Sequence, residues 1–385
     1  MWRPVLIVLQ PTPFCNISCD YCYLRNRDDR TIMGAEVVGA ISDKILPKMA
    51  SDAAPTVIWH AGEPTVVPLS WYRRSHAELR RTAPPHTNFT LQSNGVSLPS
   101  EWLSFAKETE TRIGLSIDGP QSFHDLRRKT RNGKGTWALV MQTLRRLQDS
   151  GIHPNVVTVL HPLSLRAADQ YFEFYRDHGI THVSFSIDEA EGCHSVSSFG
   201  RGDQGDAIAE FLLTLLKRAY AEQYPLHIKE VERIATVLAG GELNNELIDA
   251  WQVLVVAANG DVTTFSPEFM EVRSEAHHHF NFGNILKDDF DSIFASHLVA
   301  VTQAEIRRGV ELCRARCQYF AVCGGGAPAN KMQENGSLES SETMFCRMSV
   351  QPAAEAFRRF VQWGAQQGRH DCPDFKNGIL AEQNT

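Results

Sequence analysis

Residues 5–24 read VLIVLQPTPFCNISCDYCYL, an apolar run followed closely by three cysteines. The run is aliphatic and β-branched, and it is too short to span a membrane, so we predict a buried strand over residues 4–9. Cys15, Cys19 and Cys22 then lie in the loop after this strand. Loops that follow buried strands are common places for functional sites. We therefore take this loop as the starting point for both fold and function.

Composition and charge decide how these cysteines are interpreted. The chain has 385 residues, of which 43% are hydrophobic and 22% are charged, and its net charge is −7. These values indicate a globular protein with a large core and argue against a nucleic-acid partner. No export signal or membrane span is evident, so we expect a cytoplasmic protein with no membrane association. In that reducing compartment, the nine cysteines are expected to be metal ligands or catalysts rather than disulfides.

Apolar runs alternate with helical patterns along the first half of the chain. Further strands are predicted near residues 56–60, 88–92, 112–116, 155–159 and 182–186, and helices over residues 34–50, 70–82, 100–108, 135–150 and 165–178. Six strand–helix repeats predict a parallel sheet, because each helix returns the chain across it. Six units are fewer than the eight of a closed barrel. The predicted fold class is therefore α/β, a partial (β/α)6 TIM-type barrel.

The second half of the chain is less regular. The segment from about 190 to 206 is rich in Gly and Ser and is predicted to be a mobile loop, and a helical region is expected over about 205–250. The turn Asn259-Gly260-Asp261 separates two apolar runs and predicts a β-hairpin. A last helix is predicted at 350–366, followed by a polar tail.

The first three cysteines favour an iron–sulfur cluster. Three thiolates can hold one face of a four-iron cube and leave one iron open, and an open iron can bind S-adenosylmethionine through its amino and carboxylate groups. A zinc site would need a fourth ligand nearby. The next His or Cys after Cys22 is His60, which argues against zinc.

The cysteine spacing CxxxCxxC, with an aromatic residue before the last cysteine, resembles the motif of the radical SAM superfamily. Four later segments are similar to the family's GGEP, QTNG, SxDG and HDxxR motifs, and the first of them, AGEP, has Ala61 in place of glycine. A simple turn explains any one of these segments alone, but four in order after the cysteines favour the resemblance. It implies that Cys15, Cys19 and Cys22 hold a [4Fe-4S] cluster and that S-adenosylmethionine is bound by Tyr21, Gly62, Glu63, Ser93, Asn94, Ser116 and Arg128.

A second group of cysteines lies near the other end of the chain, at Cys313, Cys317, Cys323 and Cys346. Four thiolates can complete the ligation of one four-iron cluster or of one zinc ion, although the spacing fits a zinc ribbon poorly. The segment resembles the SPASM extension, which commonly holds two auxiliary clusters with seven cysteines. Three of those seven positions have no cysteine here. Phe265 and Ala327 occupy two of them, and no cysteine lies near Trp251, where the third would precede the hairpin. The resemblance thus implies one auxiliary [4Fe-4S] cluster and two clusters per chain.

The same resemblance predicts a domain organisation. It consists of the radical SAM partial barrel over residues 1–235, a bridging hairpin and helix region over 236–300, and a SPASM-like domain with a C-terminal helix over 301–385.

Residues 323–331 read CGGGAPANK, and together with Tyr319-Phe320 and Glu342-Thr343 they resemble the cyclophane-forming subgroup of SPASM peptide maturases, the GrrM/OscB, FxsB and XyeB type. The resemblance implies a ribosomally made precursor peptide as substrate and a flavodoxin or ferredoxin as electron donor. The implied reaction begins with a 5′-deoxyadenosyl radical that abstracts a Cβ hydrogen and ends with a crosslink from an aromatic ring to that Cβ.

Several alternatives stay open at this point. An anaerobic sulfatase-type maturase, which forms formylglycine, shares many of these motifs but usually keeps both auxiliary clusters. A thioether-forming enzyme or an epimerase is another possibility, and an epimerase would need a hydrogen donor such as Cys193, whose simpler interpretation is an incidental thiol. A non-enzymatic iron–sulfur protein that binds peptides and senses redox state is the alternative from a different class.

Two carboxylates are candidate catalytic residues. Asp118 is expected to orient the cofactor or act as a base, or simply to cap its turn. Glu189 follows the last predicted strand and is expected to take the proton lost on crosslinking, or to be a solvated carboxylate. The run His277-His278-His279 is disfavoured as a metal site, because adjacent residues on an extended chain face opposite ways. Cys372 stands alone in the tail.

Overall fold

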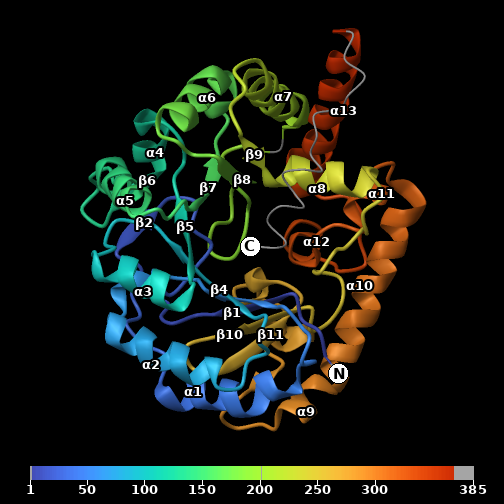
Figure 1. Ribbon diagram of the computed structural model, residues 1–385. Coiled ribbons are helices and arrows are strands. Elements are labelled where there is room, and N and C mark those ends of the chain that lie inside the picture. The colour runs from blue at the N-terminus through green and yellow to red at the C-terminus, as the bar shows by residue number, and fades with distance from the viewer. Residues whose placement is uncertain (1, 201, 368–385) are drawn as a thin grey trace.

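The computed structural model describes residues 2–200 and 202–367. Its centre is a ten-stranded sheet in the order β12-β11-β10-β1-β3-β4-β5-β7-β8-β9. Every pair from β10 to β9 along this order is parallel, and the two pairs at the other end, β10 with β11 and β11 with β12, are antiparallel. The chain is therefore an α/β protein with a mostly parallel sheet (Figure 1).

All six strands predicted in the first half of the chain are confirmed. They are β1 (Leu6–Leu9), β3 (Thr56–Trp59), β4 (Asn88–Ser93), β5 (Arg112–Ser116), β7 (Asn155–Leu160) and β8 (His182–Ile187). In β3, β4, β7 and β8 every second residue is buried, which is the alternation expected of strands in a packed sheet. The strands follow one another across the sheet in chain order.

The helices predicted between these strands are also present. They are α1 (Ala35–Ala40), α2 (Leu69–Arg80), α3 (Glu101–Thr109), α5 (Trp137–Asp149) and α6 (Ala168–Asp177). The first predicted helix, 34–50, continues past α1 as a π-helical turn (Ile41–Ile45) and a 3-10 turn (Leu46–Lys48). Pro47 lies in that last turn and cannot donate the backbone hydrogen bond that an α-helix requires there. Figure 1 shows these helices side by side along the outside of the strands.

The predicted hairpin forms from β10 (Val253–Val256) and β11 (Asp261–Thr264). All four residues of β10 are buried, and β10 pairs in parallel with β1, so the hairpin extends the main sheet. The periodicity of the sequence does not predict this pairing, because it joins residues 6–9 to residues 253–256, which are far apart in the chain. A short strand, β12 (Gly283–Asn284), completes that side of the sheet.

The helical region expected over 205–250 is shorter than predicted. It consists of α7 (Gly205–Ala221), the short strand β9 (His227–Ile228) and α8 (Lys229–Leu238). The helix ends there because Gly240 adopts a positive φ of 91°. The last predicted helix is confirmed as α13 (Gln351–Gln366), which packs against α7 and α8. The polar tail and Cys372 lie outside the described residues.

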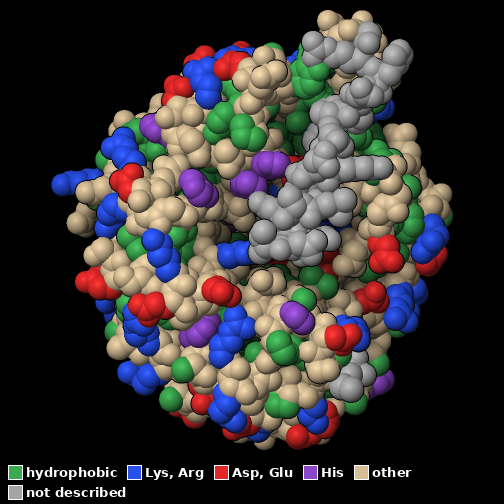
Figure 2. Space-filling view, in the orientation of Figure 1, with side chains coloured by type: hydrophobic (Ala, Val, Ile, Leu, Met, Phe, Trp, Pro, Cys, Tyr) green, Lys and Arg blue, Asp and Glu red, His purple; other side chains and the backbone are tan. Residues whose placement is uncertain are grey.

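The other elements frame the two cysteine groups. A two-stranded sheet pairs β2 (Ile17–Cys19) with β6 (Arg128–Thr130), next to α4 (Gln121–Arg127). In the second cysteine group, Cys313 lies on α10 (His297–Arg316), Cys323 ends α11 (Phe320–Cys323), and Cys346 begins a π-helical turn (Cys346–Val350). The helix α9 (Phe290–Phe294) precedes α10, and α12 (Pro328–Asn335) follows α11. On the face shown in Figure 2, acidic and basic side chains are interspersed. Within the described ranges, none of the helices combines the length and the apolar character that crossing a bilayer requires.

Candidate active site

A cavity of about 430 Å³ brings together most of the residues that the motifs single out. It lies at the carboxyl ends of the parallel strands, where strand-end loops converge. Its lining contains Cys15, Cys19, Cys22, Tyr21, Gly62, Glu63, Ser93, Asn94, Ser116, Arg128 and Glu189. These residues follow β1, β3, β4, β5 and β8, so the topology of the sheet rather than their spacing in the chain makes them neighbours.

Arginine side chains hold the cysteine loop through its backbone carbonyls. Arg27 Nη1 donates to the carbonyl of Cys19 at 3.1 Å, and Arg131 Nε donates to that of Cys15 at 2.9 Å. Burial is the main reason why the pKa of Cys15 is raised to about 11 and that of Cys19 to about 12. These thiols keep their protons in the bare protein, so a bound metal has to displace them. The loop thus presents three thiols as possible ligands, that of Cys19 buried and those of Cys15 and Cys22 half-buried.

The AGEP segment makes a close backbone approach to the cysteine loop. A Cβ atom on Gly62 would lie 2.1 Å from the carbonyl oxygen of Thr12, and the φ of Gly62 is 99°, so only glycine fits. Ala61 adopts a φ of 66°, a left-handed conformation that costs a residue with a Cβ roughly 1–2 kcal/mol. The backbone therefore has the glycine-type shape of the motif although Ala61 replaces its first glycine.

Glu63 is a structural link between two motifs. Its Oε1 accepts from the backbone N–H of Thr65 at 3.0 Å and from Ser93 Oγ at 2.8 Å, and its Oε2 accepts from the N–H of Asn94 at 2.7 Å. Asn94 Nδ2 in turn donates to Asn16 Oδ1 at 2.8 Å in the cysteine loop. These bonds use both carboxylate oxygens of Glu63 and align three strand-end loops around the cavity.

Asp118, which was expected to orient the cofactor, act as a base or cap its turn, lies beside the cavity rather than in its lining. Its side chain is outside the cavity lining, where it accepts from Tyr21 Oη at 2.7 Å and from the N–H of Val159 at 3.1 Å. Arg128 Nη1 lies 3.7 Å from Asp118 and donates to Tyr21 Oη at 2.6 Å. Asp118 is 1% exposed. Its role in this geometry is to orient Tyr21 and Arg128, which do line the cavity.

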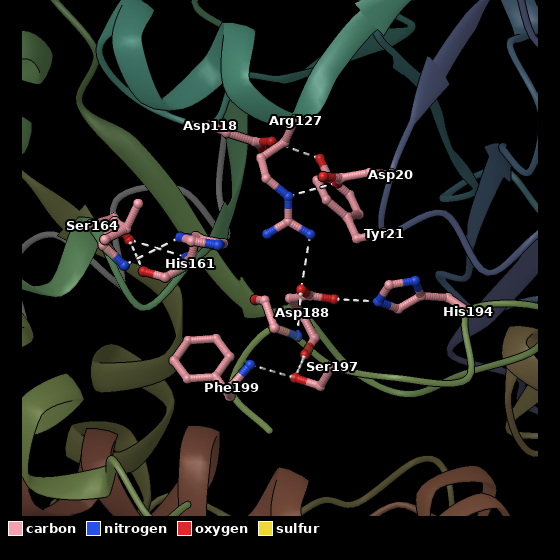
Figure 3. A network of polar contacts seen from close by, with 12 residues as sticks. Asp20, Tyr21, Asp118, Arg127, His161, Ser164, Asp188, His194, Ser197 and Phe199 are labelled. Carbon is pink, nitrogen blue, oxygen red and sulfur yellow. Dashed lines mark hydrogen bonds and ion pairs between the residues drawn. The ribbon is translucent and has the colours of Figure 1, made fainter. Parts of the chain in front are cut away.

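Sequence reasoning missed a buried polar network beside the cavity (Figure 3). Figure 3 shows the guanidinium of Arg127 between Asp20 and Asp188, with Nε 2.5 Å from Asp20 Oδ1 and Nη2 2.8 Å from Asp188 Oδ2. Asp188 also accepts from the N–H of Ser198 at 2.9 Å, and its Oδ1 lies 2.7 Å from His194 Nε2. Although burial would raise the pKa of Asp188, the hydrogen bonds from Ser198 and Arg127 hold it below its usual value. One feature of the sequence could have indicated this network. The HDxxR motif accounts for Arg128 but not for the arginine directly before it, Arg127.

This network changes the interpretation of the segment that was predicted to be mobile. Ser197 Oγ donates to the carbonyl of Asp188, and the N–H of Cys193 donates to that of Tyr23 at 3.0 Å. The segment is therefore anchored to the cysteine loop at several points. Cys193 Sγ is directed at the carbonyls of Leu24, at 3.3 Å, and Cys22, at 3.4 Å, and Cys193 is outside the cavity lining. This geometry gives Cys193 no support as a hydrogen donor to a substrate.

Glu189 lies on the wall of the cavity together with Glu191 and Glu268. Its Oε2 accepts a hydrogen bond from Asn330 Nδ2, which anchors the carboxyl group to α12. Burial, followed by the charges of Glu268 and Glu334, raises the pKa of Glu189 to about 8. A cavity carboxyl group with such a pKa can exchange a proton near neutral pH.

The second group of cysteines lines a separate cavity of about 440 Å³, which contains Cys313, Cys317, Cys323 and Cys346. Burial is the main cause that raises the pKa of Cys346 to about 11. Two donors point at these sulfurs, since the N–H of Gly326 lies 3.2 Å from Cys323 Sγ and Thr343 Oγ1 lies 3.2 Å from Cys346 Sγ. Four thiols around one cavity can supply the four cysteine ligands of an iron–sulfur cluster.

The three positions without a cysteine are part of the core. Phe265 is fully buried and Trp251 is 3% exposed, and Trp251 stacks on Phe294 with ring centroids 5.0 Å apart. Ala327 is also buried and lines the first cavity with Asn330 and Phe345. The segment that bears the second cysteine group thus forms part of the wall of the first cavity.

The three consecutive histidines form no metal site in the part of the chain that the structure describes. His277 bonds to Ser274 and to Glu305, at 2.8 and 2.7 Å. Within the same residues, no three His, Cys, Asp or Glu side chains form a group that could hold a single metal ion.

Comparisons with known proteins agree with this geometry. Residues 9–178 match the family model described as the Radical SAM superfamily. The chain is 32% identical over 358 residues to the uncharacterized protein sll1766 of Synechocystis sp., which covers 91% of this chain and 90% of that protein. It is 28% identical over 225 residues to a serine-type anaerobic sulfatase-maturating enzyme of Bacteroides thetaiotaomicron, over 54% of this chain and 53% of that enzyme.

Two solved structures show a similar fold. One is native anSMEcpe with bound AdoMet and Cp18Cys peptide, with a TM-score of 0.75 and 18% identity, covering 94% of this chain and 99% of that chain. The other is Streptococcus suis SuiB bound to precursor peptide SuiA, with a TM-score of 0.63 and 15% identity, covering 90% of this chain and 76% of that chain. At these identities the likeness concerns the fold.

Proposed function

Because this chain belongs to the radical SAM superfamily, we propose that it is a maturase that crosslinks an aromatic ring of a precursor peptide to a nearby Cβ. The observation that carries the proposal is the shared cavity. Its lining joins the first three cysteines to Ala327, Asn330 and Phe345 of the segment with the second cysteine group. A peptide held there would contact both halves of the molecule. The peptides bound by the structurally similar anSMEcpe and SuiB support this class of substrate.

The residues of the first cavity fit S-adenosylmethionine and one [4Fe-4S] cluster, and those of the second cavity fit another [4Fe-4S] cluster. Cys15, Cys19 and Cys22 would hold the first cluster, and Cys313, Cys317, Cys323 and Cys346 the second. Arg128 lines the cavity, and its buried Nε atom has no hydrogen-bond partner within the described structure, as expected where a ligand completes the site. When bound, the first cluster and S-adenosylmethionine supply the 5′-deoxyadenosyl radical that removes a hydrogen atom from the substrate.

We also propose the architecture that the resemblance implies. The chain-order succession of six parallel strands supports a partial (β/α)6 barrel over residues 1–235. The hairpin extending the sheet supports a bridging region over 236–300, and the second cysteine cavity supports a SPASM-like domain from residue 301. The end of that domain, at 385, lies outside the described residues.

The function is tested by co-expression with a short peptide encoded next to this gene, followed by mass spectrometry. We expect the loss of two hydrogen atoms for each crosslink, and we expect the two joined residues to stay together after proteolytic cleavage between them. An unmodified peptide, in the presence of S-adenosylmethionine, a reductant and a flavodoxin or ferredoxin, would contradict the proposal.

The sulfatase-type alternative is favoured by the named relatives in the comparison. It predicts a formylglycine aldehyde, formed from Ser or Cys, in a sulfatase peptide. Hydroxylamine reacts with that aldehyde and leaves a crosslink unchanged, so the same reaction mixture distinguishes the two functions.

We propose that Glu189 accepts the proton that the ring loses, and this predicts a pH dependence. The pKa of Glu189 is about 8 and its carboxyl group accepts a proton only when ionised, so the crosslinking rate of the wild type should rise with pH through that value. Glu189→Gln should remove the rise and slow the reaction roughly 10²–10⁴-fold. The measurement is the single-turnover rate of crosslink formation against pH.

Glu268→Gln is the matched control for this experiment. The charge of Glu268 raises the pKa of Glu189, so the variant should keep its activity and shift the rise to lower pH. A Glu189→Gln profile that superimposes on that of the wild type would assign the proton to another acceptor.

A further inference from the structure

Lys331 on α12 is a buried cation that the proposed chemistry does not yet use. It is 2% exposed. A buried ammonium group is costly unless it has acceptors or an opposite charge nearby. No ion pair joins Lys331 to a carboxylate within residues 2–200 and 202–367. Its neighbours are instead the thiols of the second cysteine cavity.

Lys331 lies between the segments that bear two of these cysteines. A Cβ atom added to Gly326 would lie 3.6 Å from both Lys331 Cε and Cys346 Sγ, so the lysine stem and this thiol lie beside the same residue. On α10, a Cβ atom added to Gly309 would lie 3.2 Å from Lys331 Nζ, so the ammonium group lies beside this helix one turn before Cys313. Burial raises the pKa of Cys313, and the charge of Lys331 opposes that rise.

The two cysteine groups have different electrostatic surroundings. Two sulfurs of the second group accept hydrogen bonds, Cys323 from the N–H of Gly326 and Cys346 from Thr343 Oγ1. The positive charge of Lys331 acts on a third sulfur, that of Cys313. In the first group, Asn94 Nδ2 lies 3.8 Å from Cys15 Sγ. Arg128 is near Cys19, but its charge is shared with Asp118, which lies 3.7 Å away.

A positive charge and hydrogen bonds at cysteine sulfurs stabilise the reduced form of an iron–sulfur cluster, because reduction adds negative charge. We propose that Lys331 raises the reduction potential of the cluster held by Cys313, Cys317, Cys323 and Cys346. A site of higher potential accepts electrons more readily, so Lys331 suits this site to an electron acceptor rather than to a purely structural role. This inference rests on the proposed function, which supplies the cluster.

The test is a redox titration of the reconstituted full-length protein, followed by electron paramagnetic resonance. Lys331→Met should move the reduction step of the second cluster to a more negative potential and leave that of the first cluster in place. The Cys19→Ala background, with the second cluster alone, identifies which step is which. Lys331→Arg should retain a potential close to that of the wild type, and the exposed Lys287→Met should have no effect.

Thr343→Val is the second variant, for the case that Lys331→Met does not retain its cluster. It removes one neutral donor from Cys346 and should shift the same step in the same direction by a smaller amount, whereas Thr343→Ser should not. Unchanged potentials in variants with full iron content would overturn the inference and leave the proposed function standing. Zinc instead of iron at these four cysteines would overturn both the inference and the second cluster. The proposed function would then be tested separately by the peptide assay.

Discussion

Cys19→Ala is expected to abolish the formation of 5′-deoxyadenosine and to lower the iron content from about eight to about four atoms per chain. Cys19 lies on β2, is 9% exposed, and faces the same cavity as Cys15 and Cys22. With only two of its thiol ligands left, the first cluster should not be retained. The second group of cysteines lies in a separate cavity, so its four iron atoms should remain. The measurements are iron and sulfide analysis of anaerobically reconstituted protein and chromatography of the nucleoside product.

Cys193→Ala is the matched control for Cys19→Ala. Its thiol is exposed and lies outside the lining of the cavity, so both iron content and 5′-deoxyadenosine should be unchanged. Wild-type protein with about twelve iron atoms per chain would contradict the two-cluster proposal, because that number requires a third cluster of four. Full nucleoside production by Cys19→Ala would show that these three cysteines are not the initiating site.

Asp188→Ala is expected to destabilise the protein by roughly 3–5 kcal/mol, because it leaves the charge of Arg127 buried with only one carboxylate partner. The Arg127 side chain is 5% exposed and that of Asp188 is 0% exposed, whereas that of Asp20, the other partner, is 56% exposed. The change also removes the acceptor of the Ser198 N–H and the contact with His194. We therefore expect a lower midpoint of thermal unfolding, and faster proteolysis of the segment that follows β8.

Asp169→Ala provides the comparison for a surface pair. Asp169 is 67% exposed where it meets Arg218 at 2.6 Å, and exposed ion pairs contribute only about 0–1 kcal/mol. If the two alanine variants unfold at the same temperature, the buried network does not anchor the segment. Asp188→Asn keeps an acceptor for Ser198 without the charge, so its stability should lie between those of Asp188→Ala and the wild type.

Local pattern accounts for the parts of the fold that were predicted correctly. The six parallel strands are short apolar runs that can be seen in the sequence, and helical patterns separate them. The cysteine loop could also be predicted from local sequence. Cys15, Cys19 and Cys22 are separated by so few residues that the covalent chain keeps them together. The cavity residues after β3, β4 and β5 were found because each follows a strand, and parallel strands end at the same edge.

What could not be predicted depends on contacts between distant segments. The parallel pairing of β10 with β1 joins residues 253–256 to residues 6–9, and no local pattern specifies which strand an apolar run will pair with. The hydrogen bonds that Asp118 accepts from Tyr21 and from the N–H of Val159 could not be predicted, because they join it to segments far away in the sequence. The anchored segment after β8 looked mobile because its Gly and Ser content hides the buried Asp188 that holds it.

The alternating α/β order, the three-cysteine loop and the four cysteines that could form a second centre are visible in the sequence, because near neighbours along the chain set all of them. Three features follow from the folded structure alone: the segment with the second cysteines forms a wall of the first cavity, Arg127 and Asp188 tie the cysteine loop to β8, and Lys331 is buried beside the segments that bear the second cysteines. These features depend on which distant segments pack together, because burial and charge pairing arise only once those segments meet.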